Sequence, residues 1–134
     1  SINSIAIGNG AGYSYQSSNS IAIGVQAGLQ AQGTNAVAIG NTAANSLQGS
    51  SAIAIGIGAA LTTQDTQGVA IGAYAGCNTQ GERAVAIGSC AGASTQGAYS
   101  IAIGNNAGSN VQLADAIAVG NAAGQEQQNL YRHK

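Results

Sequence analysis

The residues that could carry acid–base chemistry are few and scattered along the chain. The acidic residues are Asp65, Glu82, Asp115 and Glu126, and the single histidine is His133. They provide no paired carboxylates and no arrangement of a nucleophile with a base, which hydrolytic and group-transfer chemistry require. We therefore expect no catalytic residue, and we expect that the protein is not an enzyme.

The glycine-rich stretches and the two cysteines do not indicate a cofactor or a metal. Gly8-x-Gly10 and Gly56-x-Gly58 are followed by no P-loop lysine, and the chain lacks the aspartate-bearing nonapeptide of calcium-binding β-rolls. Cys77 and Cys90 lie in successive repeats but three positions out of step. That offset argues against a disulfide and favours small thiols that are buried or line turns. We expect no cofactor and no metal site.

The composition excludes several classes of protein. The chain has no Pro, Phe, Trp or Met, it contains 21 glycines, and only 5% of its residues are charged. A net charge of -1 offers no basic surface for nucleic acid or for an anionic membrane. The longest apolar run, residues 52–61, is too short to span a bilayer. We therefore expect no nucleic-acid partner and no membrane insertion of this segment.

The elements that would position any site are set by a strict repeat. The motif Ile/Val-Ala-Ile/Val-Gly recurs every sixteen residues, starting at residues 5, 21, 37, 53, 69, 85, 101 and 117. A fixed period of this kind is the signature of a solenoid. We interpret 1–134 as a single β-solenoid domain of eight sixteen-residue coils, with an irregular C-terminal tail at 129–134.

Each repeat is predicted to form two short strands. The Ile/Val-Ala-Ile/Val segment alternates with period two and is β-branched, which is typical of a strand. The Ala-Gly-x-x-x-Gln half of the repeat is expected to form the second strand. The fold class is therefore all-β, a parallel β-solenoid. Stacked in register, the first and third residues of each motif form two continuous ribs: Ile5, Ile7, Ile21, Ile23, Val37, Ile39, Ile53, Ile55, Val69, Ile71, Val85, Ile87, Ile101, Ile103, Ile117 and Val119.

The two faces of the motif strand have different chemistry, and the sequence leaves open which one points into the coil. One face carries the Ile/Val ribs, and the other carries only Ser, Ala and Gly, as in Ser20-x-Ala22-x-Gly24. In either arrangement one face can serve a contact between chains. Because a thin coil buries few large apolar side chains, we expect the chain to oligomerise. We expect Ile55→Asp to prevent folding or assembly.

A glutamine occupies the same position in every repeat: Gln16, Gln32, Gln48, Gln64, Gln80, Gln96, Gln112 and Gln128. Stacking would turn this column into an amide ladder, in which each side chain donates to one neighbouring coil and accepts from the other. The alternative is a solvated turn residue copied with the repeat. The ladder is favoured, because neighbouring turn positions vary in type while this one does not. Tyr13, Tyr15, Tyr74 and Tyr99 occupy different positions. We interpret them as surface packing residues, with contact points for a sugar or a protein as the alternative.

The motif resembles a known family of repeats. Asn19-Ser20-Ile21-Ala22-Ile23-Gly24 and Ala36-Val37-Ala38-Ile39-Gly40 are similar to the head repeats of YadA-like trimeric autotransporter adhesins, which also occur in phage and viral fibre proteins. The resemblance covers essentially residues 4–128. It implies a left-handed β-roll, a homotrimer and attachment to host or matrix surfaces.

Two functions remain open at this stage. The first is a non-enzymatic adhesive head or fibre module, a homotrimer that binds a host-surface or matrix protein or a glycan. The alternative is a self-assembling extracellular structural filament subunit that stacks head to tail through uncapped ends. Both place the protein outside the cell or on a cell or virion surface.

Overall fold

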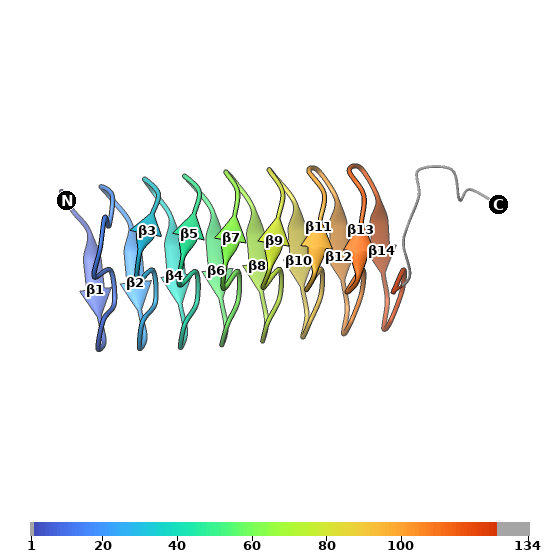
Figure 1. Ribbon diagram of the computed structural model, residues 1–134, viewed down its shortest axis with the longest axis horizontal. Helices are drawn as coiled ribbons and strands as arrows, with labels where there is room; N and C mark the ends of the chain where they lie inside the picture. The colour runs from blue at the N-terminus through green and yellow to red at the C-terminus, as the bar shows by residue number, and fades with distance from the viewer. Residues whose placement is uncertain (1, 126–134) are drawn as a thin grey trace.

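The computed structural model describes residues 2–125. The backbone winds into a rod of stacked coils, with the strands of successive coils side by side along its length (Figure 1). The described residues form strands and turns and no helix. Strand partners lie sixteen residues apart, as Ile21 pairs with Val37. The predicted parallel β-solenoid with sixteen-residue coils is confirmed.

The longer sheet consists of the eight motif strands in chain order. They are β1 (Ile5–Ile7), β2 (Ile21–Ile23), β4 (Val37–Ile39), β6 (Ile53–Ile55), β8 (Val69–Ile71), β10 (Val85–Ile87), β12 (Ile101–Ile103) and β14 (Ile117–Val119). All neighbours are parallel and in register, so that Ala54 lies between Ala38 and Ala70. Identical residue types therefore stack in columns, and the period-two alternation gives the sheet two chemically distinct faces.

The shorter sheet is built from two-residue strands that end on the recurring glutamine. They are β3 (Ala31–Gln32), β5 (Leu47–Gln48), β7 (Thr63–Gln64), β9 (Thr79–Gln80), β11 (Thr95–Gln96) and β13 (Val111–Gln112). Gln16 joins this sheet through a single parallel bridge to Gln32. The residue before each glutamine points outward, and there Thr63, Thr79 and Thr95 form an exposed column of three threonines.

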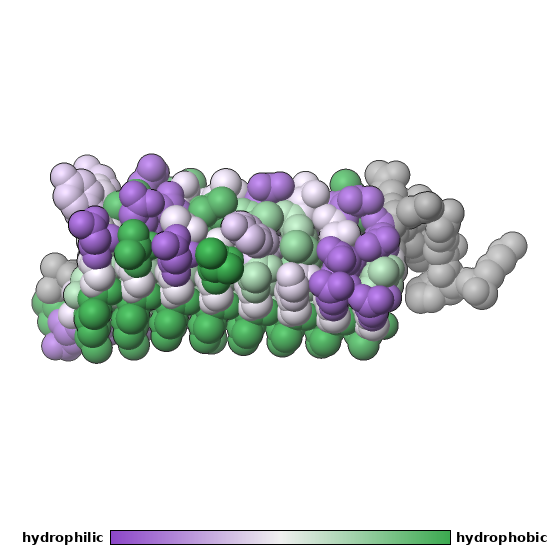
Figure 2. All heavy atoms as spheres, turned by 90° about the horizontal axis from the view of Figure 1, so that it is seen from below, coloured by the Kyte–Doolittle hydropathy of each residue, from purple (hydrophilic) through white to green (hydrophobic). Residues whose placement is uncertain are grey.

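Alanine fills the interior of the coils, and isoleucine and valine lie outside. The central alanines of the motif strands, such as Ala54 and Ala70, have no exposed surface, and they share one core cluster with Ala59 and Ala75 from the Ala-Gly segments. Ile55, beside Ala54 in the same strand, is 36% exposed. Seen from below, the apolar side chains form an unbroken row along one edge of the rod (Figure 2). The question left open by the sequence is thus answered: the small residues line the interior.

The glycine that ends each motif strand is required for two reasons. Gly72 has a φ of 128°, in a region that L side chains rarely adopt. A Cβ at this residue would lie 2.7 Å from the carbonyl oxygen of Gly88 in the next coil. Both conditions recur along the rod, and they explain why this position of the repeat does not vary.

The turn before each motif strand holds a non-glycine residue in the left-handed region. Asn19 has a φ of 58°, and Arg83 and Tyr99, at the same position of later coils, have φ values of 56° and 61°. These side chains are exposed. The position thus displays a column of variable side chains along one corner of the rod.

Candidate assembly surface and polar clusters

The most extensive apolar surface is the outward side of the longer sheet, which we call the Ile/Val face. It is formed by the ribs Ile5, Ile7, Ile21, Ile23, Val37, Ile39, Ile53, Ile55, Val69, Ile71, Val85, Ile87, Ile101, Ile103, Ile117 and Val119. In the central coils Ile55, Ile71 and Ile87 are each 36% exposed. The motif strands contain no charged residue, and at about 4.8 Å per coil the face is about 34 Å long.

Such a face is unusual on the surface of a protein that works alone. Single exposed apolar side chains are common, whereas contiguous apolar patches mark contacts with other molecules. Here the exposed side chains are in register from coil to coil, so they form a flat strip (Figure 2). The chemistry that this face supports is association with another apolar surface.

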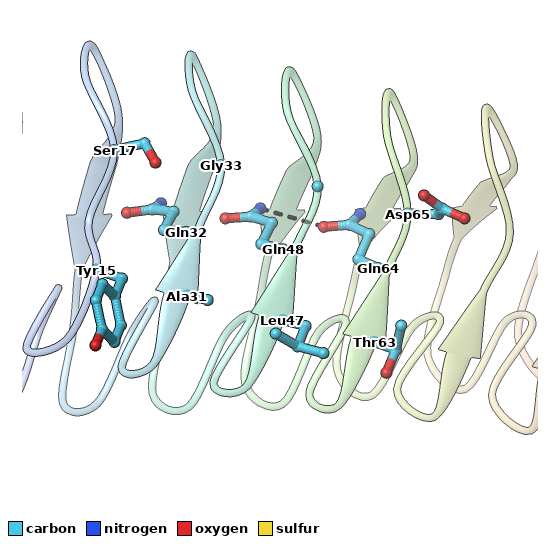
Figure 3. A pocket seen from close by; sticks show the side chains of 11 residues that line it. Tyr15, Ser17, Ala31, Gln32, Gly33, Leu47, Gln48, Thr63, Gln64 and Asp65 are labelled. Carbon is cyan, nitrogen blue, oxygen red and sulfur yellow. Dashed lines mark hydrogen bonds between the residues drawn. The ribbon is translucent and has the colours of Figure 1, made fainter.

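The recurring glutamines lie inside the coil. Gln32, Gln64, Gln80, Gln96 and Gln112 are each at most 1% exposed, and Gln48 is 4% exposed. The amide Nε2 of Gln48 donates to Oε1 of Gln64 at 3.1 Å, as Figure 3 shows, and Gln64 donates in the same way to Gln80 at 2.9 Å. The series continues from Gln80 to Gln96 and from Gln96 to Gln112, at 3.2 and 3.3 Å.

Each glutamine also closes its own coil. Gln80 Nε2 donates to the carbonyl oxygens of Val69 and Ala84, at 2.7 and 3.1 Å. The column therefore links the two sheets within a coil and successive coils along the rod. At its N-terminal end, Oε1 of Gln32 and Oε1 of Gln48 are buried without a hydrogen-bond partner, and Gln16 is only partly buried. Gln128 and the tail 129–134 lie outside the described residues.

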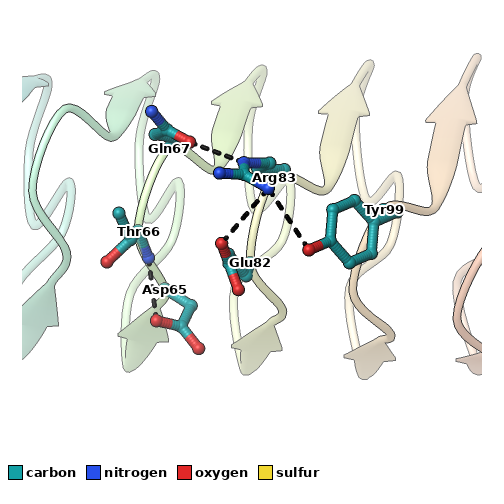
Figure 4. A network of polar contacts seen from close by, with 6 residues as sticks. All are labelled: Asp65, Thr66, Gln67, Glu82, Arg83 and Tyr99. Atoms are coloured by element: carbon teal, nitrogen blue, oxygen red, sulfur yellow. Dashed lines mark hydrogen bonds and ion pairs between the residues drawn. The ribbon is translucent and has the colours of Figure 1, made fainter.

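A second polar cluster crosses three coils at the exposed corner (Figure 4). Arg83 Nε donates to Oε1 of Gln67 at 2.7 Å, and its Nη1 donates to the hydroxyl of Tyr99 at 3.3 Å. The guanidinium carbon is 5.6 Å from the centre of the Tyr99 ring, and Nη1 is 3.6 Å from Oε1 of Glu82. The cluster was not predicted, although its signal was present: Gln67, Arg83 and Tyr99 are spaced by sixteen residues and so share one column.

The two cysteines are free thiols and are both partly buried. Burial, with a smaller contribution from the nearby Cys90, raises the pKa of the Cys77 thiol above its usual value. Cys77 Sγ lies 3.2 Å from the carbonyl oxygen of Ala93, to which the thiol donates. A protonated, hydrogen-bonded thiol is a poor nucleophile, so this group fits a turn-lining role.

Within residues 2–125, no three His, Cys, Asp or Glu side chains gather closely enough to hold a metal ion. The same residues contain no helix with the length and apolar character needed to cross a membrane. Tyr13 and Tyr15, at the N-terminal end of the rod, are 82% and 86% exposed. His133 and Glu126 belong to the residues that the structure leaves undescribed.

Geometry and comparison together define the class of protein. The stacked, in-register coils make the chain a parallel β-solenoid repeat protein. Residues 17–43 and 80–107 match the family model of the YadA head domain repeat. These two segments are therefore YadA-like head repeats, which form an adhesin repeat family and not an enzyme family. Searches of curated proteins and of solved structures gave no match.

Proposed function

We propose that this chain is a non-enzymatic β-roll module of a surface-attached adhesive or fibre protein, and that it works as a homotrimer assembled through the Ile/Val face. The observation that carries the proposal is the partial exposure of the in-register Ile/Val ribs over an alanine interior. The YadA-like head repeats support the adhesive role and a location on a cell or virion surface. A host-surface or matrix partner is the expected ligand of such a module.

The energetics favour copies of the same chain as the partner of this face. Burying the exposed third of one isoleucine contributes roughly 0.5–1 kcal/mol, so each coil adds a modest gain that is repeated along the rod. A second copy presents ribs with the same spacing of about 4.8 Å. Ribs of equal spacing can pack continuously, whereas an unrelated surface meets them at scattered points.

The test compares two single substitutions on opposite sides of the rod. Ile55→Asp places a carboxylate on the Ile/Val face, and Thr79→Asp places the same group on the exposed side of the shorter sheet. Because both positions lie outside the coil, both variants should keep the β-sheet circular dichroism of the parent. Light scattering should give three times 12.9 kDa for the parent and for Thr79→Asp, and a smaller mass for Ile55→Asp.

Two results would contradict the proposal. A parent chain that stays a stable monomer at all concentrations would remove the assembly claim, and an Ile55→Asp trimer would move the interface to another face. Concentration-dependent fibres would favour the filament alternative. One observation keeps that alternative in view: β1, at the end of the longer sheet, pairs only with β2 among the described strands.

A further inference from the structure

The outward side of the shorter sheet carries a groove at its N-terminal half. The groove runs over β3, β5 and β7 and has a volume of about 460 Å³, within the usual range for small-molecule sites. Figure 3 shows the residues that line it. It opens on the outward side of the shorter sheet, whereas the Ile/Val face is the outward side of the longer sheet. Assembly through the Ile/Val face would therefore leave the groove open to solvent.

The hollow arises because small residues interrupt two columns of larger side chains. In one column Ala31 lies between Tyr15 and Leu47, and in the other Gly33 and Gly49 lie between Ser17 and Asp65. Tyr15 and Asp65 occupy coils three steps apart, which corresponds to about 14 Å along the rod. The groove is thus bounded by an aromatic ring at one end and by a carboxylate at the other.

The floor of the groove has no free backbone donors for an added peptide strand. The N–H of Gly33 donates to the carbonyl of Gln48 at 2.8 Å, and that of Gly49 donates to Gln64 at 2.7 Å. The N–H of Ala31 is likewise bound to Ser46 at 2.9 Å. Strand addition requires an unpaired sheet edge, which these residues do not offer. A ligand here must be recognised by the side chains that rim the groove.

Those side chains combine apolar surface with hydroxyl and carboxylate groups. The Tyr15 ring is 86% exposed and Leu47 is 52% exposed. Ser17 and Thr63 add hydroxyls. Asp65 Oδ1 accepts the N–H of Thr66 at 2.8 Å, which orients the carboxylate. The lining contains no cation, so an anionic ligand would meet an uncompensated negative charge.

We propose that this groove binds a neutral pyranose saccharide of about two rings. A pyranose presents an apolar C–H face that can stack on Tyr15 and contact Leu47, and its hydroxyls can donate to Asp65 and exchange hydrogen bonds with Ser17 and Thr63. The proposal rests on the proposed function in one respect, because it gives the adhesive module a class of ligand. It does not depend on the trimer.

The test is saturation-transfer NMR with four named probes: lactose, cellobiose, maltose and N,N′-diacetylchitobiose, each at millimolar concentration. We expect transfer to the ring C–H protons of at least one probe. In Tyr15→Ala the affinity for that probe should fall by at least about tenfold, and in Asp65→Asn it should fall measurably. Tyr13→Ala removes an equally exposed tyrosine that does not line the groove and should leave binding unchanged.

The outcomes are decisive in both directions. Absence of transfer to all four probes, or equal binding by Tyr15→Ala and the parent, would overturn the proposal. Binding of 3′-sialyllactose more tightly than lactose would overturn it as well, since the groove holds a carboxylate and no cation. Circular dichroism of each variant confirms folding. If the parent chain is a monomer and still binds a saccharide, the homotrimer is contradicted and the groove proposal is supported. The experiment therefore separates failure of the trimer from failure of the groove.

Discussion

Gln64 and Gln80 lie sixteen residues apart, and the amide of the first donates to the carbonyl oxygen of the second at 2.9 Å inside the rod. Both side chains are buried, at 1% and 0% exposure. A buried amide without partners destabilises a fold, and here the partner is the same residue of the next coil. The chemical identity of this position is therefore tied to the exact repetition of the coil.

Replacing Gln80 with leucine should strongly destabilise the rod. The variant loses the hydrogen bonds to Val69, Ala84 and Gln96 and leaves those carbonyl oxygens with fewer donors. Each unsatisfied buried polar group costs about 1–3 kcal/mol, so we expect a loss of about 2–4 kcal/mol. Urea unfolding followed by circular dichroism measures the loss.

The matched control for this experiment is Gln26→Leu. Gln26 is an exposed glutamine of a turn, and its substitution should change the free energy of unfolding by less than about 0.5 kcal/mol. Equal effects of the two substitutions would show that the internal hydrogen bonds of Gln80 contribute nothing specific.

Enlarging an interior alanine should cost more than changing the isoleucine beside it. Ala54 has no exposed surface and belongs to the cluster of buried alanines inside the coils. Ala54→Leu adds volume that the core lacks, and overpacking costs about 1–3 kcal/mol. Ile55→Leu conserves volume on the outward face and should stay within about 0.5 kcal/mol. Thermal unfolding measures both variants. A larger loss of stability in Ile55→Leu than in Ala54→Leu would contradict the assignment of the interior and outward faces.

The sequence was sufficient to predict the architecture because the repeat determines it. A sixteen-residue period without insertion forces neighbouring coils into register, and the alternation of Ile-Ala-Ile predicts a strand with two unlike faces. What the period could not decide is the direction of curvature. Ala54 and Ile55 are equally compatible with a strand. In the structure the interior beside the glutamines holds small side chains, chiefly alanine, and the isoleucines lie on the outward face.

The surface features were harder to predict because they arise between columns. Tyr15 and Asp65 lie 50 residues apart in the sequence, and they bound one groove only because the columns between them hold Ala31, Gly33 and Gly49. No repeat motif marks such a hollow; it depends on departures from the repeat. The sixteen-residue spacing places Arg83 in one column with Gln67 and Tyr99. The packing of the guanidinium on the Tyr99 ring depends on side-chain conformations that the repeat does not determine.

One glycine occupies a position that holds other residues in the neighbouring coils, and replacing it should stabilise the fold. Gly68 occupies a position that holds buried alanines, Ala52 and Ala84, in the adjacent coils. A Cβ at Gly68 would lie 3.1 Å from Gln64 Cγ, 3.2 Å from the carbonyl oxygen of Asp65 and 3.3 Å from Gln80 Oε1, tight contacts at a position where both adjacent coils hold alanine. Gly68→Ala removes backbone freedom from the unfolded chain. We expect a gain of about 0.5 kcal/mol in the free energy of unfolding, measured by urea denaturation.

Gly72→Ala, on the other side of β8, provides the opposite case. Its Cβ would meet the backbone oxygen of Gly88 at 2.7 Å, and its φ of 128° disfavours any L side chain. Because backbone atoms of a stacked coil cannot shift independently, this variant should lose more than about 2 kcal/mol. A stabilised Gly72→Ala, or a Gly68→Ala as damaged as Gly72→Ala, would contradict the coil-to-coil packing described for these residues.

The raised pKa of Cys77 should appear in both reactivity and stability. Burial raises this pKa first, and Cys90 adds to the shift, so the folded state holds the thiol proton more tightly than the unfolded state. The associated stability is fully present below the pKa of the unfolded thiol and is lost as pH rises through the folded pKa. Cys90→Ser isolates Cys77, and its alkylation rate by iodoacetamide should reach half-maximum at a higher pH in buffer than in urea. Identical pH profiles of the alkylation rate in buffer and in urea would show that folding does not raise the pKa of the Cys77 thiol.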